Sequence, residues 1–142
     1  MDPRVSLVTL VVADLEAARR FYVAGLGWEP LVDVPGEVLM FRTGERLVLS
    51  LWDERAAVEE IGPVVRGGTP PMTLAHNLGS RRAVDRVLDD AARAGAEVRS
   101  ATARDWGGYS GYFTDPNGFL WEVAHAPGEL SELLVPPGDE PA

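Results

Sequence analysis

A turn between two aromatic-rich runs is the feature that most constrains how this chain folds. The D-P-N-G segment at 115–118 places a proline where a turn needs a fixed φ and a glycine where it needs a left-handed residue. The flanking runs, 108–114 and 119–125, alternate and are rich in aromatic and β-branched residues, so the segment predicts a β-hairpin. Glu122 lies within the second, otherwise apolar run. A carboxylate there must be protonated, paired or metal-bound, which makes Glu122 the first candidate functional residue.

Composition excludes several classes of protein. The chain has 142 residues, no cysteine and a formal net charge of −9, so it has neither disulfides nor thiolate metal ligands. The acidic balance argues against a nucleic-acid binder, which needs a basic face. It is compatible with a cationic ligand. No apolar run approaches the roughly 20 residues that span a bilayer, and residues 1–4 do not begin a signal peptide. We therefore expect a cytoplasmic protein with no membrane partner.

Periodicity predicts the same order of elements twice: one strand, one helix and three strands. Asp14 and Ser80 precede the two helical patterns and are good N-terminal caps. The first set comprises strands near 5–12, 28–34, 38–42 and 46–52, and the second comprises strands near 72–78, 96–100, 108–114 and 119–125.

Local echoes support an internal duplication. F-R-T-G-E-R-L-V-L-S-L at 41–51 answers F-T-D-P-N-G-F-L-W-E-V at 113–123. If one residue is taken as inserted, Leu49 becomes the counterpart of Glu122.

Two longer motifs carry a resemblance to a known family. They are V-T-L-V-V-A-D-L-E-A-A-R-R-F-Y-V-A-G-L-G-W at 8–28 and G-Y-F-T-D-P-N-G-F-L-W-E-V at 111–123. With these the chain resembles the vicinal oxygen chelate superfamily of glyoxalases, bleomycin-resistance proteins and ring-cleaving dioxygenases. The resemblance implies an α+β fold in which two βαβββ modules form a U-shaped mixed sheet around a cleft, in a homodimer.

The resemblance also implies how the chain is organised. We expect one domain, residues 1–127, made of two modules at about 4–53 and 70–127 that are joined by a connection at 54–69. The remainder, 128–142, is acidic and rich in proline and glycine. We expect it to be a flexible tail.

The ligand positions of metal-using relatives are mostly lost. In such relatives four ligands project from the first and last strands of each module, and by resemblance these positions fall on Leu7, Leu49, Thr73 and Glu122. One carboxylate cannot hold a divalent ion that prefers several His or carboxylate ligands. We therefore expect a metal-independent protein without a cofactor. The alternative is a divalent metal held by Glu122 and, after a register slip, by His76.

Aromatic residues near strand ends complete the predicted site. Small-molecule sites are usually apolar and aromatic, with a few polar groups. The predicted ligand-binding set is Trp52, Trp106, Tyr109, Tyr112, Leu7, Leu49, Thr73 and Glu122. The first hypothesis is binding or sequestration of a small molecule, cationic or aromatic in character. The alternative is an enzyme: a metal-dependent lyase, isomerase or dioxygenase, or a metal-free enzyme with Glu122 as general base.

Overall fold

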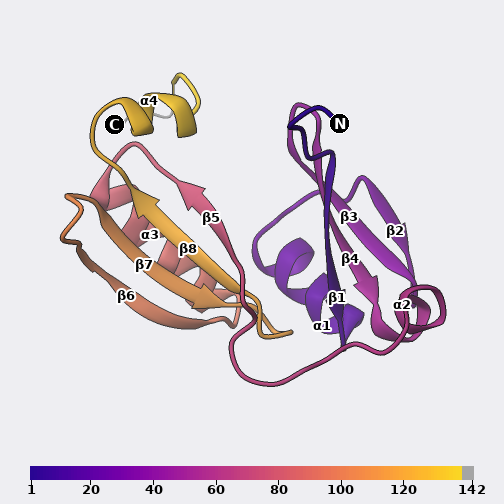
Figure 1. Cartoon of the computed structure of the whole chain (residues 1–142). Coiled ribbons are helices and arrows are strands. Elements are labelled where there is room, and N and C mark those ends of the chain that lie inside the picture. Colours follow the sequence, from indigo (N-terminus) through magenta and orange to yellow (C-terminus); the bar gives the residue numbers. More distant parts are fainter. Residues whose placement is uncertain (139–142) are drawn as a thin grey trace. The chain divides into compact units, whose positions relative to one another are not determined.

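A computed structural model describes residues 1–138 of the chain (Figure 1). The chain divides into two compact units, Met1–Gly67 and a second that begins at Gly68. Each unit contains a four-stranded mixed sheet and a helix that packs on it. The α+β class and the repeated order of strand, helix and three strands are therefore confirmed.

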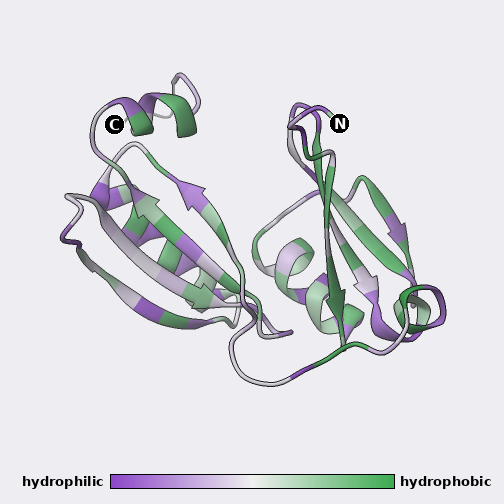
Figure 2. Cartoon of the chain, viewed as in Figure 1, coloured by the Kyte–Doolittle hydropathy of each residue, from purple (hydrophilic) through white to green (hydrophobic). Residues whose placement is uncertain are grey.

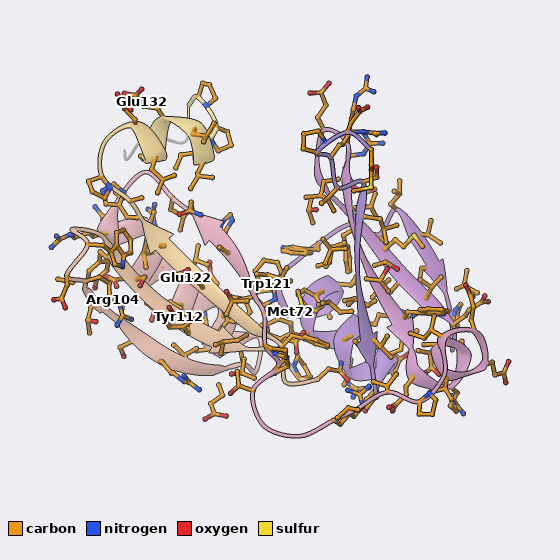
Figure 3. The ribbon with its side chains drawn as sticks, viewed as in Figure 1. Met72, Arg104, Tyr112, Trp121, Glu122 and Glu132 are labelled. Carbon is orange, nitrogen blue, oxygen red and sulfur yellow. The ribbon has the colours of Figure 1, made fainter. Side chains whose placement is uncertain are left out.

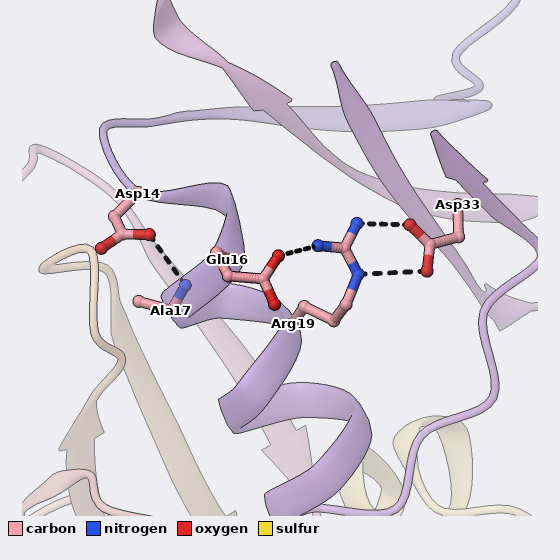
Figure 4. Close-up of polar contacts among 5 residues, drawn as sticks. All are labelled: Asp14, Glu16, Ala17, Arg19 and Asp33. Atoms are coloured by element: carbon pink, nitrogen blue, oxygen red, sulfur yellow. Dashed lines mark hydrogen bonds and ion pairs between the residues drawn. The ribbon is translucent and has the colours of Figure 1, made fainter. Parts of the chain in front are cut away.

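The first unit has the sheet order β1-β4-β3-β2, in which β1 is parallel to β4 and the other pairs are antiparallel. The Asp14 carboxylate accepts a hydrogen bond of 2.8 Å from the Ala17 amide and so starts the helix (Figure 4). Its elements are β1 (Leu7–Val12), α1 (Leu15–Arg19), the π-helical segment η1 (Arg20–Gly25), β2 (Val32–Val34), β3 (Val38–Gly44), β4 (Leu47–Asp53) and α2 (Glu54–Ile61). The strand expected at 28–34 is shorter than predicted.

An aromatic cluster fills the core of the first unit. Tyr22 on η1 is fully buried, and its ring centroid lies 5.8 Å from that of Phe41 on β3 and 5.2 Å from that of Trp28. Trp28 and Phe41 meet edge to face at 5.2 Å. Figure 2 shows apolar residues along nearly all of β1, whose inward side chains Leu10 and Val12 are buried.

The second unit has the order β5-β8-β7-β6, with β5 parallel to β8. Ser80 caps α3 through its hydroxyl, which accepts a hydrogen bond of 3.2 Å from the Ala83 amide. The predicted hairpin at 115–118 joins β7 to β8, and the buried Asp115 carboxylate accepts from the amides of Asn117 and Phe119 at 2.9 Å each. The elements are β5 (Thr73–Asn77), α3 (Arg81–Arg93), β6 (Glu97–Ala103), β7 (Tyr109–Thr114), β8 (Leu120–His125) and α4 (Glu129–Leu134).

The region expected to be a flexible tail contains structure. Residues 129–134 form α4, whose Leu130, Leu133 and Leu134 follow helical spacing, which the proline and glycine content concealed. Residues 139–142 of that expected tail lie outside the described residues. None of the helices within residues 1–138 combines the length and the hydropathy that a membrane crossing requires.

An ion pair joins α1 to the edge strand β2. Arg19 Nε donates to Asp33 Oδ2 at 3.1 Å, and the other guanidinium nitrogens contact Asp33 Oδ1 and Glu16 Oε2 (Figure 4). The hydrogen bond from Arg19 lowers the pKa of Asp33 below its ordinary value of 3.8, although burial opposes this shift. The folded state therefore favours the ionised carboxylate.

This geometry predicts a pH-dependent contribution to stability. A lowered folded-state pKa stabilises the fold above pH 3.8, and the contribution disappears as the pH falls through the folded pKa. The Asp33 side chain is 36% exposed, so Asp33→Asn should lower the free energy of unfolding by a measurable amount below about 1 kcal/mol at pH 7, and by a smaller amount at about pH 3. Thermal unfolding at both pH values measures the difference. Glu37→Gln, an exposed carboxylate nearby, is the control, and an equal melting temperature for wild type and Asp33→Asn at pH 7 would contradict the prediction.

Candidate functional site

Glu122 lies on the face of the second sheet that α3 does not cover. Helix α3 packs on the opposite face, because a Cβ added at Gly111 would lie 2.6 Å from Leu88 Cδ1, a side-chain atom of α3. Val123 pairs with Gly111 and is fully buried on that covered side. Successive side chains of a strand alternate, so Glu122 points to the other side. We call this side the Glu122 face.

Cross-strand pairing brings Tyr112 beside Glu122. The two residues are direct partners on β7 and β8, and Ala75 on β5 is the partner of Glu122 on its other side. The Tyr112 hydroxyl donates to Glu122 Oε1 at 3.4 Å, and both side chains are half-buried. Figure 3 shows these side chains on neighbouring strands of the second sheet. The structure thus brings together two residues of the predicted site.

Arg104 adds a positive charge to this pair. Its guanidinium carbon lies 5.8 Å from the centroid of the Tyr112 ring. Two bonds fix it: Nε donates to Ser110 Oγ and Nη2 donates to the Ser110 carbonyl, each at 2.9 Å. Ser110 is 1% exposed and alternates onto the same face as Tyr112. Arg104 and Ser110 are not among the residues predicted from the sequence; the two-residue spacing of Ser110 and Tyr112 is the signal that indicates Ser110.

Trp106 lies at the tip of the turn between β6 and β7. The Arg104 amide donates to the Gly108 carbonyl and the Gly107 amide donates to the Arg104 carbonyl, each at 2.9 Å. A Cβ added at Gly108 would lie 1.8 Å from two atoms of the Trp106 indole. The bond from Arg104 to Gly108 continues the pairing of Ala103 with Tyr109 by one residue, so alternation places Gly108 and the adjacent indole on the Glu122 face. Trp106 is 53% exposed there.

Tyr109 lies on the opposite face of the same strand. Its hydroxyl donates to Asp85 Oδ1 on α3 at 2.8 Å, and Arg81 of α3 lies 5.3 Å above its ring. The bond to Asp85 raises the pKa of Tyr109 above its ordinary value. Three residues separate Tyr109 from Tyr112, which reverses the face. Tyr109 is therefore placed with α3 and not beside Glu122.

Thr73 and His76 also lie on opposite faces of their strand, β5. Thr73 pairs with Leu120 and so shares the Glu122 face, one row from Glu122 itself. His76 pairs with Val123, which lies on the α3 side. The register slip that would have let His76 join Glu122 is absent from this strand pair, because Ala75 takes the adjacent position. His76 and Glu122 therefore lie on opposite faces of this sheet, and this register does not support the alternative in which both bind one metal.

In the first unit the predicted residues divide between two faces. Leu49 pairs with Phe41, which contacts Tyr22 of η1, and Leu49 is 3% exposed in the core. Leu7 and Trp52 alternate onto the other face of that sheet. Leu49 is thus not the counterpart of Glu122. The segments 41–51 and 113–123 have equal length, so no residue is inserted and Ser50 takes that place.

The donor set around Glu122 does not fit a divalent ion. Within residues 1–138, no group of three or more His, Asp or Glu side chains is arranged to hold a metal. The partners of Glu122 are a phenol and a methyl side chain, and a guanidinium lies over that phenol ring. A neighbouring positive charge opposes a cation.

The comparisons with known proteins fit this architecture. A sequence model of the Glyoxalase/Bleomycin resistance protein/Dioxygenase superfamily matches residues 4–123. The chain belongs to this superfamily. No curated protein matches the chain.

Solved structures from this superfamily resemble the chain over most of its length. A glyoxalase-related enzyme from Fulvimarina pelagi is 35% identical, with a TM-score of 0.80 over 88% of this chain and 89% of that one. A glyoxalase/bleomycin resistance protein/dioxygenase from Nocardioides is 28% identical, with a TM-score of 0.72 over 91% and 90%. A lactoylglutathione lyase from Agrobacterium tumefaciens is 25% identical, with a TM-score of 0.67 over 87% and 94%.

Proposed function

We propose that this chain binds a small organic molecule on the Glu122 face without the help of a metal. Glu122 accepts a hydrogen bond from an amine or hydroxyl of the ligand. The observation that carries the proposal is the cluster of Glu122, Tyr112 and Arg104 on a sheet face that α3 leaves uncovered. Binding sites combine a largely apolar surface with a few convergent polar groups of this kind.

The Glu122 carboxylate can accept hydrogen bonds in addition to its contact with Tyr112. Its contact with the Tyr112 hydroxyl is 3.4 Å, which is long for a hydrogen bond between oxygens. An ionised carboxylate has about four acceptor positions, and this contact uses one. Its neighbours across and along the strands, Ala75 and Ala124, have small apolar side chains that supply no donor. A ligand donor can therefore approach Glu122 from the β5 side.

The metal-independent character rests on chemistry at four strand positions. In the first unit, Leu7 and Ser50 offer an alkyl group and a hydroxyl; in the second unit, Thr73 and Glu122 offer a hydroxyl and one strong oxygen ligand. Divalent ions of the zinc or iron type are held by several imidazoles or carboxylates. These donors support a polar recognition site at Glu122 in place of a metal centre.

A metal-free enzyme is the second candidate. Glu122 would take a proton from a substrate and the Tyr112 hydroxyl would stabilise the charge that forms, since the two groups lie within 3.4 Å. The relative that is 35% identical is described as a glyoxalase-related enzyme. This candidate requires turnover that depends on Glu122, whereas the binder requires affinity alone.

The proposal predicts that Glu122→Gln selectively weakens ligand binding. Ligand-observed NMR with a library of amine- and hydroxyl-bearing fragments should yield ligands whose affinity falls about tenfold or more in Glu122→Gln, equivalent to about 1.4 kcal/mol. Glu129→Gln, an exposed residue of α4, is the matched control and should bind as wild type. A set of ligands among which none depends on Glu122 would contradict the proposal.

Elemental analysis of protein purified without chelator tests the metal-independent part. We expect far less than one equivalent of any divalent metal and an unchanged melting temperature after chelation. One tightly held equivalent that is lost in Glu122→Gln would reject this part and favour the metal-dependent enzyme.

A further inference from the structure

Because Gly108 has no side chain, the Trp106 indole can occupy the space beside it. A Cβ at position 108 would lie 1.8 Å from Cη2, 1.8 Å from Cζ3 and 2.6 Å from Cε3 of that indole. All three atoms belong to the six-membered ring, so this edge of the ring lies against Gly108. Any side chain at position 108 would displace the ring.

The backbone gives no other reason for glycine at this position. Gly108 does not have a positive φ, whereas its neighbour Gly107 has φ +94°. The three atoms nearest to an alanine Cβ at position 108 all belong to the far end of an exposed side chain. Alanine at position 108 should therefore move the indole at little cost to the fold.

The held indole extends the polar cluster along one strand. Gly108 directly precedes β7, and Ser110 and Tyr112 follow it at every second residue, so about 13 Å of extended chain separates position 108 from position 112, beside Glu122. Arg104 lies between them, bonded to Ser110 and above the Tyr112 ring. An exposed aromatic ring thus lies at one end of the row and a carboxylate at the other.

We propose that Gly108 is a positioning residue that holds Trp106 as a flat aromatic wall of the ligand site. The inference rests on the proposed function and specifies its ligand class: a planar aromatic molecule with an amine or hydroxyl at the end of a chain about 10 Å long. The ring stacks on Trp106. The donor group reaches Glu122.

Dansylcadaverine has this form, because a naphthalene ring is joined by a five-carbon chain to a primary amine. Its fluorescence anisotropy reports binding directly. We expect Trp106→Leu and Gly108→Ala each to weaken binding about tenfold, as expected for the loss of an aromatic stack. The double variant Gly108→Ala/Trp106→Leu should bind no more weakly than Trp106→Leu alone, because Gly108 acts through Trp106. Leu133→Ala, an exposed apolar residue of α4, is the control and should bind as wild type.

Competition with cadaverine, which lacks the ring, separates the two contacts. Its affinity should fall in Glu122→Gln and remain unchanged in Gly108→Ala and Trp106→Leu. Additive effects of the two substitutions on dansylcadaverine, or failure of wild type to bind it, would overturn the inference. Binding that depends on Glu122 and not on Trp106 would overturn the inference and leave the proposed function standing. Dependence on Trp106 without Glu122 would instead reject the proposed function.

Discussion

Gly111→Ala is expected to lower the free energy of unfolding by about 3 kcal/mol, because overpacking at this position meets atoms that cannot move aside. The added Cβ would lie 2.8 Å from the Ala101 amide nitrogen, 2.8 Å from the Arg99 carbonyl oxygen and 2.6 Å from Leu88 Cδ1. Two of these atoms are backbone atoms of β6, where the register with β7 shifts between Arg99 and Thr102. Relief would require β6 to move away from β7 or α3 to move off the sheet.

Urea unfolding followed by circular dichroism measures this effect. Gly108→Ala, three residues earlier in the same chain segment, is the matched control and should change stability by less than about 1 kcal/mol. The contrast depends on the atoms in contact: backbone and a buried leucine at Gly111, and an exposed indole at Gly108. Equal destabilisation by the two alanines would show that the contacts at Gly111 relax more easily than the structure indicates.

Phe41→Ala is expected to destabilise the protein by about 3–5 kcal/mol, as is usual when a buried aromatic side chain is truncated. Phe41 is 1% exposed and contacts both Tyr22 and Trp28. Its removal would leave a cavity between β3 and η1 that these rings cannot fill without moving.

Phe41→Leu is the matched variant, since it keeps most of the apolar volume, and it should cost about 1.5 kcal/mol. Thermal or urea unfolding of the two variants gives the difference. A loss below about 1 kcal/mol for Phe41→Ala would mean that Trp28 closes the gap and that the cluster is less tightly packed than described.

The local signals of the fold could be read from the sequence because each depends on a few neighbouring residues. The D-P-N-G segment predicted the hairpin. The structure adds the reason, since the Asp115 carboxylate accepts hydrogen bonds from the amides of Asn117 and Phe119. Asp14 and Ser80 were predicted as helix caps, and both accept the expected amide bond. The cleft and the homodimer that the resemblance implies stay predictions.

The site was harder to predict because faces depend on register, and one residue reverses a face. The assumed insertion moved the counterpart of Glu122 from Ser50 to Leu49, which is in the core. Tyr109 and Tyr112 were both predicted to line the ligand site, yet their side chains lie on opposite faces of β7. Arg104 reaches Ser110 and Tyr112 across a turn, a contact that no spacing rule foretells.

The parallel pairs β1–β4 and β5–β8 have a consequence for how each sheet is completed during synthesis. In each unit the first strand of the sheet pairs with the strand of that sheet that is synthesised last. It does not pair with the next strand in the chain. A nascent chain that stops before residue 120 would leave β5 and β7 without the strand that joins them. Glu122 belongs to that joining strand, so a chain long enough to carry this carboxylate is nearly long enough to complete the sheet that holds it.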